Sequence, residues 1–323
     1  MQAIIGITAG DPAGIGLEVI LKALPHARDL ARWVLFTTRA TFERNAAVVP
    51  HRQIDSLDQI GADGLFVFFV ADGDPHIHFG KLSSNAGAEA LACLSAAGQA
   101  ALAGRIDAVV TGPVNKYAIG PAFRGQTDFL AEQAECESFA MAFFAPTLKV
   151  VLATIHLSLR DALAKISTVL YIDLIRFVDS ELKRFHFESR RIAVAAINPH
   201  AGEHGMFGDE DDRLLRPAVE QCASEGISVS GPHSADSLYY RAHTGEFDAV
   251  IAPYHDQGLA PVKLIAHGNS TNVTLGLPYV RTSPDHGTAF DIAGKGLADP
   301  AAMLSAMKCA ADLVKRHCHA DGD

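Results

Sequence analysis

The chain has 323 residues, of which 49% are hydrophobic and 20% are charged, and its formal net charge is −10. This length predicts one large or two medium domains, and the acidic balance argues against a nucleic-acid binder, which would carry a basic stripe. No apolar stretch approaches the roughly 18 residues of a membrane-spanning helix, the first residues lack the basic start of a signal peptide, and the five cysteines form no C-x-x-C pair. We therefore expect a cytoplasmic protein without a disulfide framework.

Short apolar runs alternate with helical patterns along the chain. The expected strands include residues 4–8, 33–37, 65–70 and 108–111. The expected helices are residues 17–24, 85–103, 171–185, 214–224 and 300–317, with Asn85 as the N-cap of the second and Gly104 as its stop. The alternation predicts a doubly wound α/β fold.

Three further apolar runs each end in a histidine. Residues 150–155 lead into His156, residues 192–199 into His200 and residues 249–254 into His255. Such runs are typical of buried strands in a parallel sheet, and ligands bind outside the carboxyl ends of these strands. Three imidazoles with an open position form the ligand set of a catalytic divalent metal. A single histidine after a strand is more often structural, so the pattern alone leaves both interpretations open.

Two glycine-bearing segments are candidate ligand loops. Gly10-Asp-Pro-Ala-Gly-Ile-Gly opens a helix, as phosphate-binding loops do, but Val19 stands where a dinucleotide fingerprint needs its third glycine. A structural turn is therefore favoured for this segment. Residues 285–296 form a second loop in which Asp291 can accept hydrogen bonds from ribose hydroxyls, and a plain loop leading into a helix fits this segment equally well.

Candidate anion ligands follow several of the strands. They are Gln126, Thr127, Lys263, Asn272 and Arg281. Lys, Asn and Arg together can clamp a carboxylate or a phosphate, with Arg able to bind in a bidentate manner. The alternative is a set of scattered surface residues, which the mostly apolar surroundings of the last three disfavour.

Taken together, the motifs resemble those of the 4-hydroxythreonine-4-phosphate dehydrogenases, a family of vitamin B6 biosynthesis. The resemblance spans about residues 4–305 and rests on Gly10-Asp-Pro-Ala-Gly-Ile-Gly, Thr111-Gly-Pro-Val-Asn-Lys, Asn198-Pro-His-Ala-Gly-Glu, His255-Asp-Gln-Gly, Thr274-Leu-Gly-Leu-Pro and Arg281-Thr-Ser-Pro-Asp-His-Gly-Thr-Ala. The loop at residues 285–296 also resembles the nucleotide-binding loop of isopropylmalate and isocitrate dehydrogenases, which share the family's fold.

The resemblance implies a two-domain α/β homodimer of the isocitrate/isopropylmalate dehydrogenase type, with the active site in the interdomain cleft. The expected first domain is residues 1–130 plus 265–323, with the cofactor loop, and the second is residues 131–264, with the metal histidines and the dimer interface. The implied ligands of one divalent metal (zinc, magnesium or cobalt), drawn from both subunits, are His156, His200 and His255. The implied contacts to NAD or NADP are His286, Gly287 and Asp291.

The implied reaction oxidises the C3 hydroxyl of 4-phosphohydroxy-L-threonine. Hydride passes to NAD or NADP, the metal acts as a Lewis acid that favours the alkoxide, and decarboxylation gives 3-amino-2-oxopropyl phosphate. The implied substrate contacts are Thr127, Lys263, Asn272 and Arg281, together with Gln126. Asp236 and Lys263 are the two candidates for the general base.

Gln126 departs from the family pattern, in which the residue before Thr127 is usually His. Glutamine keeps a donor and an acceptor but cannot carry charge. Replacing a charge-assisted hydrogen bond by a neutral one costs roughly 1 kcal/mol, about fivefold in affinity. The chain is thus either a tolerant member or a paralogue that acts on 4-phospho-D-threonate, 4-phospho-D-erythronate or a terephthalate cis-dihydrodiol. A metal-dependent lyase or hydrolase is the non-redox alternative, and a structural metalloprotein would need a fourth ligand that no comparable strand end supplies.

Overall fold

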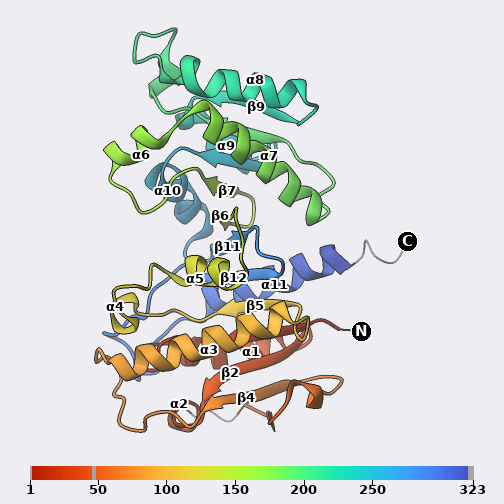
Figure 1. The fold of residues 1–323 in the computed structure, drawn as a ribbon, viewed down its shortest axis with the longest axis vertical. Coiled ribbons are helices and arrows are strands. Elements are labelled where there is room, and N and C mark those ends of the chain that lie inside the picture. The colour runs from red at the N-terminus through yellow and green to blue at the C-terminus, as the bar shows by residue number, and fades with distance from the viewer. Residues whose placement is uncertain (1, 46–48, 319–323) are drawn as a thin grey trace. The chain divides into compact units, whose positions relative to one another are not determined.

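The computed structural model describes residues 2–45 and 49–318. The chain divides into two compact units, each with its own strands and helices (Figure 1). One unit comprises Met1–Phe139 with Thr271–Cys318, and the other comprises Ala140–Ser270. The second unit is therefore an insertion in the sequence of the first.

The sheet of the first unit is mostly parallel. Its strand order is β3-β4-β2-β1-β5-β12-β11, and only β11 runs antiparallel to its neighbour β12. The strands are β1 Ile4–Thr8, β2 Arg32–Thr38, β3 Arg52–Ile54, β4 Leu65–Ala71, β5 Ala108–Thr111, β11 Thr271–Leu275 and β12 Val280–Pro284. The four strands that the sequence predicts in this unit are confirmed to within one or two residues, because continuous apolar runs suit strands that helices cover on both faces.

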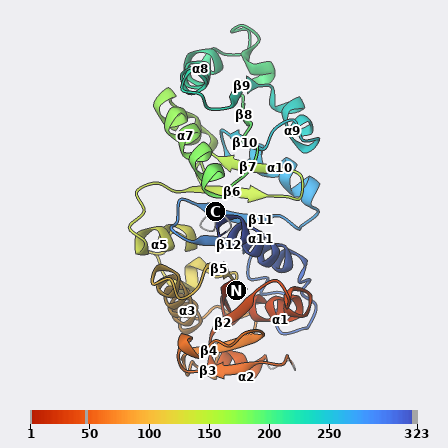
Figure 2. The same ribbon diagram turned by 90° about the vertical axis from the view of Figure 1, so that its right-hand side faces the viewer.

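Helices cover both faces of this sheet, with α3 and α5 on one side and α1 and α11 on the other (Figure 2). The helices and turns are α1 Gly16–Ala27, α2 Arg39–Arg44, η1 Leu57–Gln59, α3 Ser84–Leu102, α4 Lys116–Ile119, α5 Gln126–Gln133 and α11 Ala301–Cys318. On the α3 side, Phe36 of β2 and Phe66 of β4 pack with Leu94 of α3 in one buried cluster. Burial of aromatic and aliphatic side chains of this size supplies most of the stability of such a layer.

The start of α3 differs from the prediction. The N-cap is Ser83, whose side chain accepts from the Ala86 N–H, while Asn85 lies inside the helix and donates to Asp74 instead. Serine and asparagine are both good caps, so the sequence alone does not choose between them. Gly104 follows the helix with a φ of +66°, which confirms it as the stop.

The strands of the second unit follow the order β6-β7-β10-β8-β9, and among these pairs only β6 and β7 are antiparallel. Its strands are β6 Ala140–Phe144, β7 Lys149–Leu152, β8 Ile192–Ala195, β9 Val229–His233 and β10 Ala249–Ala252. Its helices and turns are α6 Leu159–Lys165, α7 Thr168–Arg184, η2 Pro199–Gly202, η3 Asp211–Leu215, α8 Arg216–Ser224, α9 Ala235–His243 and α10 His255–Ala266. Figure 2 shows α7 and α8 on one side of this sheet and α9 and α10 on the other.

The three strands that precede the predicted metal histidines are shorter than expected. Each strand ends three to five residues before its histidine, at Leu152, Ala195 and Ala252. The expected strand ends at residues 155, 199 and 254 are therefore wrong, since the last apolar residues of each run belong to the connection that leaves the sheet. The three strands are nevertheless parallel neighbours, with β10 between β7 and β8, so their carboxyl ends meet at one edge.

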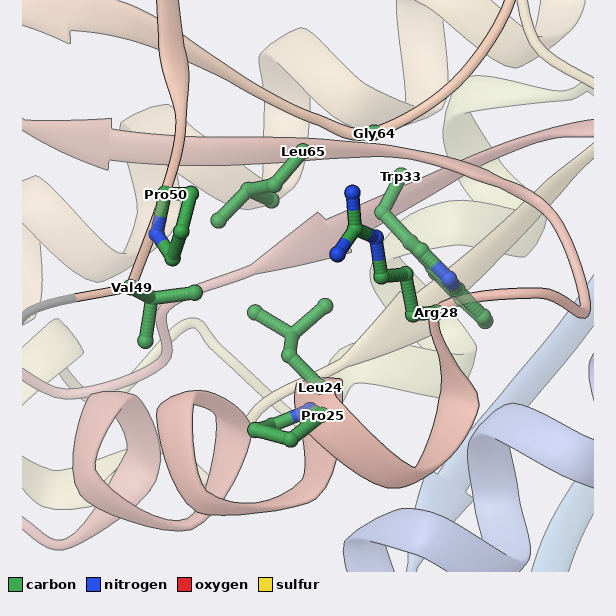
Figure 3. Close-up of a pocket in the computed structure, with 8 residues that line it drawn as sticks. All are labelled: Leu24, Pro25, Arg28, Trp33, Val49, Pro50, Gly64 and Leu65. Carbon is green, nitrogen blue, oxygen red and sulfur yellow. The ribbon is translucent and has the colours of Figure 1, made fainter.

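A mostly apolar pocket of about 200 Å³ lies in the first unit, between the end of α1 and the starts of β2 and β4 (Figure 3). Its lining residues are Leu24, Pro25, Arg28, Trp33, Val49, Pro50, Gly64 and Leu65. It lies at the amino ends of the strands, whereas ligands of open α/β sheets bind at the carboxyl ends. It is therefore separate from the polar groups described next.

Among the described residues, no helix is both long enough and apolar enough to cross a membrane.

Candidate active site

A buried arginine is the centre of the polar groups in the first unit. Arg281 lies on β12, is only 2% exposed, and donates to the hydroxyls of three threonines. Its Nη2 lies 2.7 Å from the Thr111 Oγ1, and its Nη1 lies 3.0 Å from the Thr274 Oγ1 and 3.3 Å from the Thr127 Oγ1. No acidic side chain of the described chain pairs with it, and its Nε has no partner there.

The electrostatics of Arg281 follow from this burial. Loss of solvation lowers the pKa of Arg281 to about 10, so the group is still cationic at neutral pH. Threonine hydroxyls orient the guanidinium but bring no negative charge. A buried cation without a counter-ion is costly, and an anionic ligand is the usual compensation.

The fold explains why these residues meet. Thr274 faces Arg281 across the antiparallel β11–β12 pair, and β12 runs parallel to β5, which ends at Thr111. Thr127 enters from the first turn of α5, and its Oγ1 lies 3.4 Å from that of Thr274. The structure thus brings together two of the predicted anion ligands, Thr127 and Arg281, at one place in the first unit.

Gln126 and Asn272 lie beside this cluster and each present a buried oxygen. The Gln126 Nε2 donates to the Gly112 carbonyl at 3.2 Å, while its Oε1 is buried and has no donor in the described chain. The Asn272 Oδ1 is likewise buried without such a donor. Asn272 precedes Thr274 by two residues on β11, so both side chains leave the same face of the strand.

The glycine-bearing loop after β1 is a turn and not a phosphate cradle. The Asp11 N–H donates to the Pro113 carbonyl, the Gly14 N–H to the Asp11 carbonyl and the Ile15 N–H to the Thr288 carbonyl, all at 2.9–3.0 Å. Gly10 has a φ of +76°, and a Cβ there would lie 2.5 Å from the Pro113 oxygen, so glycine is required. The N–H groups of Asp11, Ala13, Gly14 and Ile15 are already used within the protein, so these four hydrogen bonds tie the loop to the neighbouring segments.

Asp11 is a carboxylate that the sequence analysis did not select. It is 2% exposed, its Oδ1 accepts from the Ala13 N–H at 2.8 Å, and its Oδ2 is buried without a partner in the described chain. Burial raises the pKa of Asp11, although backbone N–H groups of Ala13 and Asn115 oppose the shift. A buried acid at the end of the first strand is the signal that could have identified it.

The loop at residues 285–296 packs against the loop after β1. Gly14 has no room for a Cβ because the Thr288 carbonyl would lie 2.9 Å away. His286 contacts the Gly287 carbonyl through Nδ1 at 2.9 Å, and its Nε2 is buried without a partner in the described residues. Asp291 is exposed. The predicted cofactor residues thus lie near the carboxyl end of β1, in the same unit as Arg281.

The three predicted metal histidines all lie in the second unit, after β7, β8 and β10. The rings of His156 and His255 have centroids 5.8 Å apart. His200 lies in η2 with a left-handed φ of +54°, and its side chain is 59% exposed. Within residues 2–45 and 49–318, no three His, Cys, Asp or Glu side chains come together as a metal site.

Carboxylates accompany two of these histidines. The His255 Nδ1 lies 2.7 Å from an Asp256 oxygen, and the His200 Nδ1 lies 3.8 Å from an Asp236 oxygen. Histidines that bind metal through one nitrogen usually give the other to a carboxylate or carbonyl. The donor set therefore suits a divalent metal bound through Nε2.

The two candidates for the general base are both in the second unit. Asp236 is in the first turn of α9, is 65% exposed, and accepts from the Ser234 hydroxyl at 2.8 Å. That hydrogen bond, helped by His200, lowers the pKa of Asp236, which makes its carboxylate a weaker base. Lys263 is exposed on α10, eight residues after His255.

Two hydrogen-bond partners of Arg281, Thr111 and Thr274, were not selected as site residues from the sequence. Both belong to motifs that resemble the family, Thr111-Gly-Pro-Val-Asn-Lys and Thr274-Leu-Gly-Leu-Pro. Their role becomes visible only when strand pairing sets them opposite or beside the guanidinium.

The fold and these groups define an α/β protein with a buried arginine whose guanidinium reaches the carboxyl end of β5 in a mostly parallel sheet. Comparison with known proteins specifies the class further. Residues 29–310 match the family model described as pyridoxal phosphate biosynthetic protein PdxA. The chain is 38% identical to the D-threonate 4-phosphate dehydrogenase of Salmonella typhimurium, over 96% of this chain and 98% of that protein. It is also 38% identical to the 4-hydroxythreonine-4-phosphate dehydrogenase of Beijerinckia indica, over 96% of this chain and 94% of that protein.

Solved structures give the same result. The crystal structure of a 4-hydroxythreonine-4-phosphate dehydrogenase from Klebsiella pneumoniae matches with a TM-score of 0.89 and 36% identity, covering 97% of this chain and 98% of that one. The isocitrate dehydrogenase of Methylococcus capsulatus, at 14% identity and a TM-score of 0.50, shares the fold alone.

The chain therefore belongs to the PdxA family. This confirms the family that the motifs resemble and the α/β fold of the isocitrate dehydrogenase type. Because the relatives named above are dehydrogenases, the chain is an oxidoreductase of that family.

Proposed function

We propose that this protein is a metal-dependent NAD(P) dehydrogenase that oxidises a secondary hydroxyl of a phosphorylated four-carbon acid. The observation that carries this proposal is Arg281, a buried cation held by three threonine hydroxyls without an acidic partner in the described chain. A phosphate or carboxylate supplies the missing charge and can accept from the guanidinium. The names of the relatives support a phosphorylated substrate.

Two substrates share this chemistry. 4-Phosphohydroxy-L-threonine and 4-phospho-D-threonate each carry a phosphate, a carboxylate and a C3 hydroxyl. In either case the C3–H bond breaks, its hydride reduces the nicotinamide, and the hydroxyl proton leaves to a base, which gives a 3-oxo acid that can lose carbon dioxide. The amino acid would give 3-amino-2-oxopropyl phosphate, the product expected for vitamin B6 biosynthesis.

The loop at residues 285–296 is the proposed cofactor site. Its packing against the loop after β1 holds His286 with a buried Nε2 that has no partner in the described chain. Gly287 leaves open space where a side chain would stand, and Asp291 is exposed and able to accept from ribose hydroxyls. These features support NAD or NADP binding at this loop, where the protein's part is to orient the nicotinamide.

His156, His200 and His255 are the proposed ligands of one divalent ion, for which zinc, magnesium or cobalt are the candidates. The Asp256 carboxylate contacts the His255 Nδ1 at 2.7 Å, and the Asp236 carboxylate lies 3.8 Å from the His200 Nδ1, which leaves the Nε2 of both histidines for the metal. When bound, such an ion would supply Lewis acidity to the substrate hydroxyl. Asp236, whose pKa is lowered, is proposed to position His200 and not to act as the base.

A second copy of this chain is the proposed partner. Large apolar side chains are exposed beside the loops that carry His156 and His200: Leu157, Leu159, Leu163, Val169, Met206 and Phe207. The Phe207 and His200 rings have centroids 6.1 Å apart. Such a concentration of exposed apolar residues is typical of an interface, and a homodimer would allow histidines of both copies to share one metal.

Lys263 is proposed to add a second cation for the substrate. If it acts as a clamp, Lys263→Ala raises KM and leaves kcat nearly unchanged. If kcat falls and KM holds, Lys263 takes part in the chemistry instead.

The test is NADH or NADPH formation by the metal-loaded protein with 4-phosphohydroxy-L-threonine, 4-phospho-D-threonate and 4-phospho-D-erythronate. Turnover that a chelator abolishes and that added metal restores supports the proposal. Binding of NAD without turnover of these acids would direct the search to the terephthalate dihydrodiol. Failure to bind NAD or NADP would overturn the dehydrogenase assignment in favour of a metal-dependent lyase or hydrolase.

A further inference from the structure

A short segment of the first unit contacts both the loop after β1 and the proposed cofactor loop. It comprises residues 74–80, between β4 and α3, and is called the bridging segment. Its Gly80 N–H donates to the Ala13 carbonyl at 2.8 Å. Ile77 is buried in one cluster with Ala13, and Phe290 of the cofactor loop packs against this cluster. The bridging segment therefore lies against two loops of the candidate active site.

The bridging segment and the cofactor loop pack closely. A Cβ at Gly294 would lie 2.5 Å from the Phe79 ring, and one at Gly80 would lie 2.6 Å from the Phe290 carbonyl oxygen. Both distances are well below the roughly 3.5–4.0 Å at which carbon atoms pack. The bridging segment thus rests directly on the backbone of residues 290–294, and its position helps to set theirs.

Arg44 fastens the bridging segment to the loop after β1. It is the last residue of α2, and it donates from Nη1 to the Ile77 carbonyl and from Nη2, at 2.8 Å, to the Pro12 carbonyl. The carbon at the centre of its guanidinium lies 4.8 Å from the centroid of the Phe79 ring. One cation therefore contacts both segments, through hydrogen bonds that its charge strengthens.

The surroundings of Arg44 keep it charged. Loss of solvation lowers the pKa of Arg44, while the charges of Glu89 and Asp74 oppose the shift, so the group is cationic at neutral pH. Glu89 in turn accepts from the Asp74 N–H at the start of the bridging segment. Because Arg44 bonds backbone carbonyls, its loss would release the backbone of the bridging segment directly.

We infer, on the basis of the cofactor site proposed above, that Arg44 is a positioning residue for NAD or NADP. Through the bridging segment and the loop after β1, it holds residues 286–294 in the arrangement that the cofactor meets. A loop that is already ordered binds more tightly, because less conformational freedom is lost on binding. The hydroxyls around Arg281 lie on β5, β11 and α5, so this role does not extend to the anion site.

The experiment measures the Kd of NAD and of NADP by calorimetry and the amide exchange of the ligand-free protein by mass spectrometry. Methionine keeps the length and the apolar stem of arginine but cannot donate. Arg44→Met should therefore raise the Kd of the cofactor at least tenfold and speed exchange in residues 74–80 and 288–295. The Kd of inorganic phosphate should change less than about twofold. Arg44→Lys, which can still donate to a carbonyl, should recover most of the lost affinity.

Arg39→Met is the matched control. Arg39 begins the same helix, lies over the Phe69 ring at 4.4 Å and pairs with Asp72 at 3.4 Å, so its loss should leave cofactor affinity unchanged. Phe79→Leu tests the route, because it removes the ring that packs between Arg44 and Gly294. If both residues act through the bridging segment, the double variant should lose less affinity than the product of the two single losses.

Unchanged cofactor affinity and exchange in Arg44→Met, an equal loss in Arg39→Met, or fully multiplicative losses in the double variant would overturn the inference. Melting temperatures identify a variant that does not fold. If Arg44→Met is such a variant, Arg44→Lys and Phe79→Leu decide, and unchanged affinity and exchange in Phe79→Leu would overturn the inference. If the unaltered protein binds neither NAD nor NADP, the proposed function itself fails.

Discussion

The two units hold their polar groups in opposite ways. In the first unit, Arg281 is 2% exposed and fixed by three hydroxyls from β5, β11 and α5. In the second, His200 is 59% exposed and has only a distant carboxylate at 3.8 Å. A buried cation is preorganised by the fold of one chain, whereas an exposed histidine can still bind a metal through a ring nitrogen. If the proposed sites are correct, one chain preorganises the anion site, whereas the metal site depends on further groups to complete it.

The pKa values of two carboxylates, one in each unit, are shifted in opposite directions. Burial raises the pKa of Asp11 in the first unit, and a hydrogen bond from Ser234 lowers the pKa of exposed Asp236 in the second. The same side chain is therefore pushed toward its neutral form in one unit and toward its charged form in the other.

The largest expected effect comes from removing the buried charge. Arg281→Met should lower kcat/KM for phosphorylated acids by about 30-fold to several thousandfold, because truncating one partner of a buried charged hydrogen bond costs roughly 2–5 kcal/mol. The melting temperature should hold or rise, since a buried charge without an acidic partner is lost. Steady-state kinetics and thermal melting check this, with Arg105→Met, at an exposed ion pair, as the control. Unchanged kinetics would contradict an anion site in the first unit.

His200→Ala should break the second unit's site and spare the first. Turnover should fall by at least about a hundredfold, because even partners of metal ligands are typically worth 10- to 100-fold. Metal content per chain should fall with it, while inorganic phosphate should bind as before in calorimetry. His78→Ala, at an exposed histidine of the first unit, is the control and should change neither turnover nor metal content. Full activity in a metal-stripped His200→Ala protein would end the metal hypothesis.

Asp236→Asn separates positioning from proton transfer. If Asp236 orients His200, metal affinity should fall by about 10-fold and the acid limb of the pH–rate profile should remain. Loss of the acid limb with a drop in kcat of about 10²–10⁴ would identify Asp236 as the base instead. Asp173→Asn, at an exposed position of α7, provides the matched control.

The smallest effect is on stability. Burial raises the pKa of Asp11. The stabilisation that its protonated form contributes is therefore fully present below the unfolded pKa of about 3.9 and is lost as pH rises through the folded pKa. Asp11→Asn mimics the protonated acid and keeps an acceptor for Ala13, so it should stabilise the protein at pH 7 by at most about 1 kcal/mol. The gain should vanish at acid pH in urea melts. A destabilised variant at pH 7 would show that the carboxylate is favoured there.

Sequence patterns determined the α/β class, most of the long helices and the central strands, because apolar periodicity reflects burial directly. They also gave the family, through motifs spread over nearly the whole chain. The strand ends before the three histidines and the N-cap of α3 were less accessible, since an apolar residue can end a strand or begin a connection, and Ser83 and Asn85 cap equally well.

Tertiary structure alone decided the chemistry around Arg281. Thr111 and Thr127 lie 170 and 154 residues from Arg281 along the chain, and Thr274 lies on the facing strand. Only the pairing of β5, β12 and β11 and the packing of α5 place these hydroxyls on one guanidinium. The same holds for Gln126: its identity is in the sequence, but the contact of its Nε2 with the Gly112 carbonyl exists only in the folded chain. Side-chain identity is local information, whereas burial and hydrogen-bond partners depend on which distant segments the fold brings together.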